Sequence, residues 1–306
     1  MTAIASFPRL LSRGEELDPE QLGWLRESTD LLGDGPALRQ RIAEDGYLLL
    51  RGALRREEVL DARREMCQRV AKAGWLQPGT DPMEAIPAKD AKLGFSPDLA
   101  KDNAPLKKVL YSGPMMDLFG DLLGGAVRHF DFTWIRSYMP GLGTPPHCDV
   151  VYMGRGTHNV YTAWTPMGDV SLQLGGLMLL ENSFKNERLR HGIKEIDVDA
   201  YCTNRTGRSA LDMWERGQGG WFKAPPPKLR NSMGGRWLTT EYRAGDVLIF
   251  GMYMIHASLD NTSDRPPAVR FSTDTRYQLA SEPVDERWIG ENPIAHGKAG
   301  KRGKIC

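Results

Sequence analysis

Residues 140–149 read Pro-Gly-Leu-Gly-Thr-Pro-Pro-His-Cys-Asp, and they lie where the chain changes from helical to strand-like patterns. A proline-glycine turn ends an aromatic, β-branched segment at 129–139. His147 and Asp149 follow at once. In an extended strand, residues two apart share one face. The spacing therefore predicts that an imidazole and a carboxylate reach one point. Cys148 would point away from that point, and we interpret it as a packing residue.

A second histidine follows an apolar run. Residues 246–255 predict a buried strand with His256 at its end and Ser258 on the same face. Alone, a His-X-Asp tripeptide occurs by chance, and a histidine that ends an apolar strand is more often an ordinary core residue. Together, two histidines and one carboxylate form the ligand set of a facial non-heme Fe(II) site, which leaves three metal positions open. The combination favours a metal site made of His147, Asp149 and His256.

An arginine lies just beyond the second histidine. Turn-forming residues at 259–269 predict a hairpin that brings 268–277 back alongside 247–258. In one register of that hairpin, Ser258 lies opposite Arg270. A guanidinium can hold a carboxylate through two parallel hydrogen bonds. Such an arginine suits an iron centre whose co-substrate is a dicarboxylate, and a surface ion pair is the alternative interpretation.

Composition sets outer bounds on the class of protein. The 306 residues are 41% hydrophobic and 26% charged, with a formal net charge of +1. This balance gives no indication of a nucleic-acid partner. Residues 247–255 are too short to cross a bilayer, and the first residues show no secretory signal pattern. Four cysteines without a paired spacing are typical of a reducing cytosol. We expect a cytoplasmic protein without a membrane partner, and the sequence does not indicate an oligomeric state.

Residues 1–125 are predicted to be mainly helical. Helical patterns cover 17–44, 56–72 and 105–123, with a short strand at 47–50 and a long loop at 76–105. After residue 126 the pattern is strand-like, with candidate strands at 129–139, 159–165, 176–180, 246–255 and 268–277. Short strands with long intervening loops favour a jelly-roll or barrel-like antiparallel double sheet over 126–280. The predicted class is therefore mostly β with flanking helices (α+β).

Two segments do not fit a compact barrel. Residues 186–243 are long and polar, with Trp214, Trp221 and Trp237 among several glycines. We interpret this insertion as a lid or binding element, because long loops on rigid scaffolds tend to carry function. A surface excursion packed for stability is equally compatible with it. Residues 281–306 form a tail that ends in a basic, glycine-rich stretch.

The combined motifs resemble those of the phytanoyl-CoA dioxygenase family, a branch of the Fe(II)/2-oxoglutarate oxygenases. The resemblance runs from about residue 40 to about residue 280, in the family's order, and it is specific only when the motifs are taken jointly. The motifs are Asp45-Gly46-Tyr47 to Arg51-Gly52, Pro140-Gly141 before Pro146 to Asp149, Ala163 to Met167, Gly175 to Met178, Gly245-Asp246-Val247, and His256 through Asp264 to Arg270.

The resemblance implies a single oxygenase domain with a double-stranded β-helix (jelly roll, cupin-like). It implies iron held by His147, Asp149 and His256. The distal carboxylate of 2-oxoglutarate would be bound by Arg270 and Ser258. Trp164 and Ser137 match positions that face the co-substrate pocket, and an ordinary core aromatic is the alternative for Trp164. The implied reaction uses dioxygen to hydroxylate a C–H bond of a small molecule, with decarboxylation of 2-oxoglutarate to succinate.

Two departures from the family pattern keep alternatives open. Arg270 lies 14 residues after His256 instead of about 11, and Arg265 and Arg276 are the other candidates for the carboxylate clamp. The loop after Leu180 lacks a histidine that many relatives carry. A cupin-like metal enzyme without 2-oxoglutarate, or a non-catalytic binding protein on the same scaffold, are the competing hypotheses. Substrate identity and the type of oxidation are not readable. Five loop cations could meet an anionic substrate, although charges on loops are usually only solvated: Lys89, Arg190, Lys194, Arg208 and Arg236.

Overall fold

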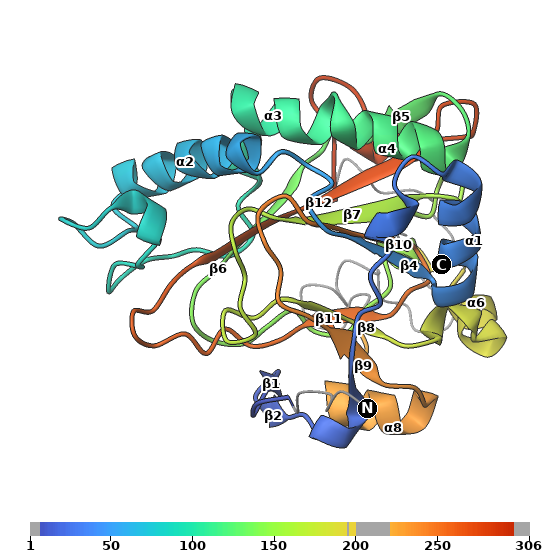
Figure 1. Cartoon of the computed structure of the whole chain (residues 1–306), viewed down its shortest axis with the longest axis horizontal. Helices are drawn as coiled ribbons and strands as arrows, with labels where there is room; N and C mark the ends of the chain where they lie inside the picture. The colour runs from blue at the N-terminus through green and yellow to red at the C-terminus, as the bar shows by residue number, and fades with distance from the viewer. Residues whose placement is uncertain (1–6, 195, 200–220, 297–306) are drawn as a thin grey trace.

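Two β-sheets face each other in this computed structural model, which describes residues 7–194, 196–199 and 221–296 (Figure 1). In the larger sheet all pairs are antiparallel, and β5 and β6 both lie beside β12, on the side away from β7. Its strands are, in spatial order, β4 (Tyr47–Leu50), β10 (Val247–Gly251), β7 (Tyr161–Pro166), β12 (Arg270–Leu279), β5 (Val127–His129) and β6 (Trp134–Tyr138).

The smaller sheet packs against the inner face of the larger one. Its strands are β11 (His256–Ser258), β8 (Leu177–Leu180), β9 (Trp237–Thr239) and β3 (Leu22–Trp24), with β3 parallel to β9. Trp164 and Leu248 of the larger sheet share a buried cluster with Leu177 and Leu238 of the smaller one. This pair of facing sheets is the expected double-stranded β-helix. A separate hairpin, β1 (Leu11–Ser12) and β2 (Glu15–Glu16), precedes both sheets.

Helices cover the outer face of the larger sheet. Figure 1 shows α2, α3 and α4 along this face, with α1 at one end. The α-helices are α1 (Gly35–Asp45), α2 (Arg56–Lys72), α3 (Ala104–Tyr111), α4 (Pro114–Leu123), α5 (Val150–Met153), α6 (Glu187–Ile193) and α8 (Pro226–Met233). Short 3-10 helices are η1 (Pro19–Gln21), η2 (Thr29–Leu31), η3 (Pro82–Glu84), η4 (Pro97–Ala100), η5 (Ser183–Lys185) and η6 (Glu286–Trp288).

Strand alternation divides the core into two layers. Leu48, Ile249 and Phe271 point outward into the cluster beneath the helices. Leu49 follows Leu48 in β4 and Phe250 follows Ile249 in β10, and both of these side chains point inward. Because successive strand residues face opposite sides, the inner face of the larger sheet is left for a different set of side chains. Along β12 that inner set is polar and charged.

Several expected elements are wrong in extent. Residues 17–44 are not one helix: Asp18 does cap a turn with Pro19 in its first position, but that 3-10 helix lasts three residues. The true helix is α1, which Asp34 caps at its start and Gly46 ends with a φ of 80°. The region between joins the smaller sheet through β3. A local cap signal marks a helix start, whereas tertiary pairing decides its length.

Three further expectations are corrected. The helix predicted at 105–123 is two helices. Gly113, with a positive φ of 52°, and Pro114 after it interrupt the helix. The strand predicted at 246–255 ends at Gly251, and a turn carries the chain into β11 of the other sheet. The predicted hairpin between β11 and β12 does not form, since β11 pairs with β8 and β12 pairs with β6 and β7. Over the described residues, no helix has the length and apolar character needed to cross a bilayer.

Candidate metal centre and carboxylate pocket

Three buried side chains converge between the two sheets. Nε2 of His147 lies 3.9 Å from Oδ1 of Asp149, and Nε2 of His256 lies 3.7 Å from the same oxygen. The ligand atoms of the three residues all lie within 4.8 Å of one another. Reciprocal backbone hydrogen bonds of 3.0 Å between His147 and His256 fix the two histidine positions. Two imidazole nitrogens and one carboxylate oxygen around one point are the donor set of a facial iron site.

Backbone carbonyls orient both imidazoles. Nδ1 of His147 lies 2.9 Å from the Pro145 carbonyl oxygen, and Nδ1 of His256 lies 3.0 Å from that of Met254. A proton on each Nδ1 leaves Nε2 as a lone-pair donor toward the site. Burial, together with the neighbouring His256, lowers the pKa of His147 to about 3. Burial also lowers the pKa of His256. Both rings are therefore neutral at pH 7, as metal ligation requires.

The second oxygen of Asp149 is already bound within the protein. Oδ2 accepts hydrogen bonds from the Thr162 hydroxyl and, at 3.0 Å, from Nη2 of Arg276. Burial alone would raise the pKa of Asp149, but the positive charge of Arg276 and the hydrogen bond from Thr162 help to hold it well below the usual range. Asp149 is thus ionised, with Oδ1 presented to His147 and His256. This arrangement favours ligation through a single oxygen.

The His-X-Asp tripeptide reaches the site by a turn and not by a strand. Asp149 has helical backbone angles, φ −70° and ψ −26°, and α5 begins at the next residue. The prediction that His147 and Asp149 share one face of a strand is therefore wrong, although the two side chains do meet. Cys148 is buried, with its sulfur 3.6 Å from the Tyr253 carbonyl oxygen, and burial raises the pKa of its thiol well above the ordinary value. Packing is the role that this environment supports.

Arg270 is the first residue of β12 and lies on the inner face of that strand, six residues before Arg276. It is 2% exposed, and burial lowers its pKa to about 10. Its Nη1 donates to the Gly175 carbonyl oxygen, while its Nε has no hydrogen-bond partner. Among the described residues no carboxylate lies within ion-pair distance of it. A buried guanidinium without a counter-charge is costly, so this site is built for an anionic ligand.

Two residues that the sequence interpretation did not assign share this face. Ser272, two positions along β12, is fully buried and its hydroxyl has no partner. Tyr138 lies opposite Arg270 in β6, with the guanidinium 4.8 Å from its ring centroid. The two-residue spacing of Arg270 and Ser272 was the available signal. These unsatisfied groups fit the distal carboxylate of a dicarboxylate co-substrate.

The other arginine candidates for the clamp are occupied elsewhere. The side chain of Arg265 is 92% exposed. Arg276 is buried against Asp149, as described above, and its guanidinium lies 4.3 Å from the Trp134 ring centroid. Of the three, Arg270 alone is both buried and without a carboxylate among the described residues.

The structure places the remaining predicted residues as follows. Trp164 faces inward on β7, next to Tyr242. Ser258 lies opposite Leu177 and not opposite Arg270, and its hydroxyl accepts a hydrogen bond from the Thr144 amide at 2.8 Å. Ser137 lies opposite Phe271, whose side chain packs beneath the helices. The expectation that Ser137 faces the pocket is therefore wrong.

A cavity of about 370 Å³ opens beside the candidate metal ligands. His147 and Asp149 form part of its wall. The loop at 76–105 contributes Phe95, and the insertion at 186–243 contributes Trp221; Trp214 and Arg208 lie outside the described residues. Its remaining lining residues are Arg13, Trp134, Arg136, Tyr138, Leu142, Gly143, Thr144, Pro145, Tyr152, Met153, Arg276 and His296.

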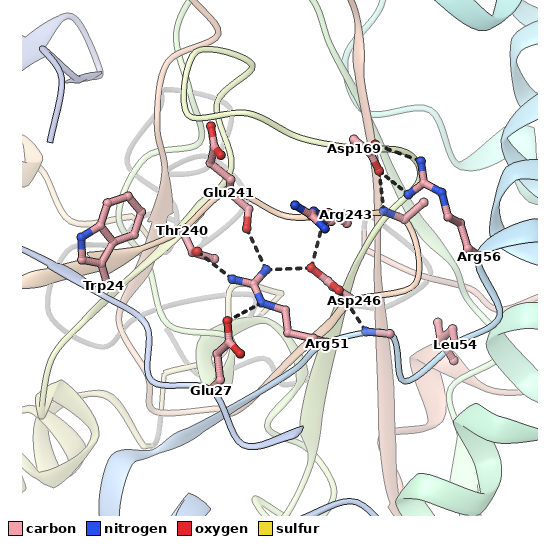
Figure 2. Close-up of a pocket in the computed structure, with 12 residues that line it drawn as sticks. Trp24, Glu27, Arg51, Leu54, Arg56, Asp169, Thr240, Glu241, Arg243 and Asp246 are labelled. Atoms are coloured by element: carbon pink, nitrogen blue, oxygen red, sulfur yellow. Dashed lines mark hydrogen bonds and ion pairs between the residues drawn. The ribbon is translucent and has the colours of Figure 1, made fainter. Parts of the chain in front are cut away.

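A wider depression of about 1060 Å³ lies elsewhere, at the ends of β4 and β10 (Figure 2). Five of its charged side chains form ion pairs with one another. Arg51 binds Asp246 at 2.7 Å and Glu27 at 2.9 Å, and Arg56 binds Asp169. The Arg51-Gly52 and Gly245-Asp246 motifs thus meet in a structural role. None of the proposed metal ligands lines this depression, so its size does not make it the reaction site.

Comparison with known proteins finds a family and, among the relatives, two proteins of the same name. The sequence model of the family described as phytanoyl-CoA dioxygenase (PhyH) matches residues 42–269. The 1-deoxypentalenic acid 11-beta-hydroxylase of Streptomyces arenae is 30% identical over 267 residues, which cover 83% of this chain and 85% of that protein. The protein of the same name from Streptomyces exfoliatus is 29% identical over 270 residues, with the same coverage of both chains.

Solved structures agree on the fold. The non-heme alpha ketoglutarate dependent carbocyclase SnoK from nogalamycin biosynthesis superposes with a TM-score of 0.55 at 17% identity. The match covers 85% of this chain and 89% of SnoK. At 17% identity, this structural similarity shows the shared fold alone.

Proposed function

Because this chain belongs to the phytanoyl-CoA dioxygenase family, it is a non-heme iron, 2-oxoglutarate-dependent oxygenase, and we propose that it hydroxylates a C–H bond of a compact, largely apolar small molecule. Both named relatives are hydroxylases, which supports this outcome. The cavity of about 370 Å³ beside the ligands admits a substrate of modest size.

We assign iron to His147, Asp149 and His256, and the distal carboxylate of 2-oxoglutarate to Arg270 and Ser272. The observation that carries this assignment is the buried Arg270. Its Nε and the hydroxyl of the neighbouring Ser272 both lack hydrogen-bond partners. The two residues share a face of β12 with Arg276, which binds Asp149. We assign Ser258 the role of holding the loop at Thr144 through its hydroxyl. Trp164 is assigned to the inner wall between the two sheets.

When bound, iron with 2-oxoglutarate supplies the oxidising power, drawn from dioxygen and from decarboxylation to succinate. The chain itself orients and shields. Carbonyl oxygens of Pro145 and Met254 turn the imidazoles, and Arg276 with Thr162 holds Asp149. Burial of all three ligands excludes bulk water from the reacting position.

The test is an anaerobic titration of the full chain with Fe(II) and 2-oxoglutarate, followed through the visible charge-transfer band of the chelated oxo-acid. We expect a band in wild type and none in His147→Ala. Arg270→Ala should weaken 2-oxoglutarate binding about 100-fold and Ser272→Ala about tenfold, from the strength of charge-assisted and ordinary hydrogen bonds.

Ser137→Ala is the matched control for Ser272→Ala. Both hydroxyls are fully buried without partners, but they lie on opposite faces of the larger sheet. Ser137→Ala should leave the 2-oxoglutarate affinity unchanged. Tight metal binding without a band would instead favour a cupin-like enzyme that uses no 2-oxoglutarate. Absence of both would favour a non-catalytic binding protein.

A further inference from the structure

The turn of the N-terminal hairpin β1–β2 lies beside the cavity, and a buried carboxylate holds it in place. Arg13 has a φ of 58°, in the left-handed region that non-glycine residues rarely adopt. The buried carboxylate of Asp260 accepts hydrogen bonds from the amides of Arg13 and Gly14, each at 2.8 Å. The same carboxylate accepts the Gly143 amide at 2.6 Å. Gly14 has a φ of 77°, and positive φ at both central residues is typical of a two-residue hairpin loop, which these three hydrogen bonds hold in place.

This locked turn directs the Arg13 side chain to the cavity that contains the metal ligands. Arg13 is part of the cavity wall together with His147 and Asp149. Its Nη1 lies 3.2 Å from the Gly143 carbonyl oxygen, which ties the guanidinium to the loop ahead of His147. The hairpin lies outside residues 42–269, which the family model matches. Arg13 therefore lies outside the part of the chain that the family model matches.

Ion pairs account for the other charged groups around the cavity. Arg276 is paired with Asp149, and Nε of Arg136 lies 2.9 Å from Oδ2 of Asp274. Arg270 is assigned to 2-oxoglutarate. Within the described part of the chain, no carboxylate lies within ion-pair distance of the Arg13 guanidinium. Arg13 is thus the lining cation that these pairings leave for a ligand from outside.

Part of the wall is suited to an apolar body. Beside Arg13 the cavity is lined by Phe95, Trp134, Leu142, Tyr152 and Met153. We propose that the substrate is an amphipathic anion, and that Arg13 binds its carboxylate while the apolar body lies against these side chains. Arg13 is then a specificity-determining residue. This inference rests on the proposed function, because it concerns the substrate of the same site.

The test uses two probes that differ only in charge, 1-adamantanecarboxylate and 1-adamantanecarboxamide. Each is titrated anaerobically into the full chain loaded with Fe(II) and saturating 2-oxoglutarate, and binding is read from the shift of the charge-transfer band. We expect wild type to bind the carboxylate about tenfold more tightly than the amide. Arg13→Asn should lose this preference, since asparagine tolerates the left-handed backbone and keeps the turn. Arg13→Lys should retain part of it.

Arg9→Gln is the matched control. Arg9 belongs to the same N-terminal segment, pairs with Glu16 across the hairpin and does not line the cavity, so its loss should leave the preference intact. The inference is overturned if wild type shows no preference for the carboxylate, if Arg13→Asn keeps the preference, or if the carboxylate removes the band by displacing 2-oxoglutarate. A wild type without any band would reject the proposed function, and the assignment of Arg13 with it.

Discussion

At the scale of single residues, the proposed metal centre depends on the hydrogen bonds made by the polar atom of each ligand that faces away from the metal position. Pro145 and Met254 carbonyl oxygens occupy Nδ1 of the two histidines, and Thr162 with Arg276 occupies Oδ2 of Asp149. Each ligand is left with one donor atom toward the common point. Hydrogen-bonding partners of this kind orient metal ligands and tune their affinity.

Thr162→Val is therefore expected to weaken Fe(II) binding about tenfold, and Arg276→Gln up to about 100-fold, because Asp149 loses the contacts that hold Oδ2. Competition with a coloured chelator measures these affinities without turnover. Thr165→Val is the control, since Thr165 lies on β7 as well but its buried hydroxyl has no partner. Equal affinities for wild type and Thr162→Val would refute the orienting role.

At the scale of elements, charged contacts join strands that are far apart in the chain. The end of β4 meets the start of β10 through Arg51 and Asp246, and Asp246 also accepts the amides of Gly52 and Arg243 (Figure 2). Asp246 is buried, whereas the nearby pair of Arg56 and Asp169 is about half exposed. Two ion pairs of the same chemical type are therefore expected to contribute differently to the stability of the fold.

Arg51→Ala should destabilise the fold by about 3 kcal/mol, because it leaves the Asp246 carboxylate buried and without its counter-charge. Arg56→Ala should cost less than about 1 kcal/mol, since exposed ion pairs contribute little. Equilibrium unfolding in urea compares the two variants directly. Similar losses for both would mean that the Asp246 contacts do not hold β4 to β10.

At the scale of the whole molecule, a buried charge cluster fastens the chain's later segments beneath the cavity. The guanidinium of Arg287 is fully buried and pairs with Asp197, Asp199 and Asp285. Asp199 also lies 2.8 Å from Nδ1 of His296, which lines the cavity. Segments nearly 100 residues apart in sequence therefore share one electrostatic centre.

This cluster predicts acid sensitivity. Burial would raise the pKa of Asp199, but hydrogen bonds from His296 and Arg287 outweigh it and lower the pKa from 3.8 to about 2. A carboxyl whose pKa is lower when folded stabilises the fold above its unfolded pKa. That contribution is lost as pH falls from about 4 to about 2. Thermal unfolding from pH 7 to pH 2 measures it.

Asp199→Asn should be less stable than wild type at pH 7, and its stability should fall less steeply between pH 4 and pH 2. An exposed carboxylate variant, Asp98→Asn, is the control, because Asp98 forms an exposed surface pair with Lys101. Parallel pH profiles for wild type and Asp199→Asn would contradict the role given to the cluster.

The sequence by itself determined the local chemistry of this protein. Helical periodicity predicted α2 over Arg56–Lys72 with its observed bounds, and β4 and β8 lie where apolar runs predicted strands. Residue type, spacing and order were enough to select His147, Asp149 and His256 as the proposed metal ligands, because ligand chemistry is carried by the side chains themselves. The family's motifs then allowed the fold class to be predicted.

Only the tertiary structure decided how those pieces meet. It placed β11 and β12 in different sheets, Ser137 on the outer face and Ser272 on the inner one. It also used Arg276 to hold Asp149, and it brought Arg13 to the cavity from outside the matched region. Periodicity and capping act within a few residues, whereas sheet pairing joins segments more than 100 residues apart, and no local pattern encodes such a partner.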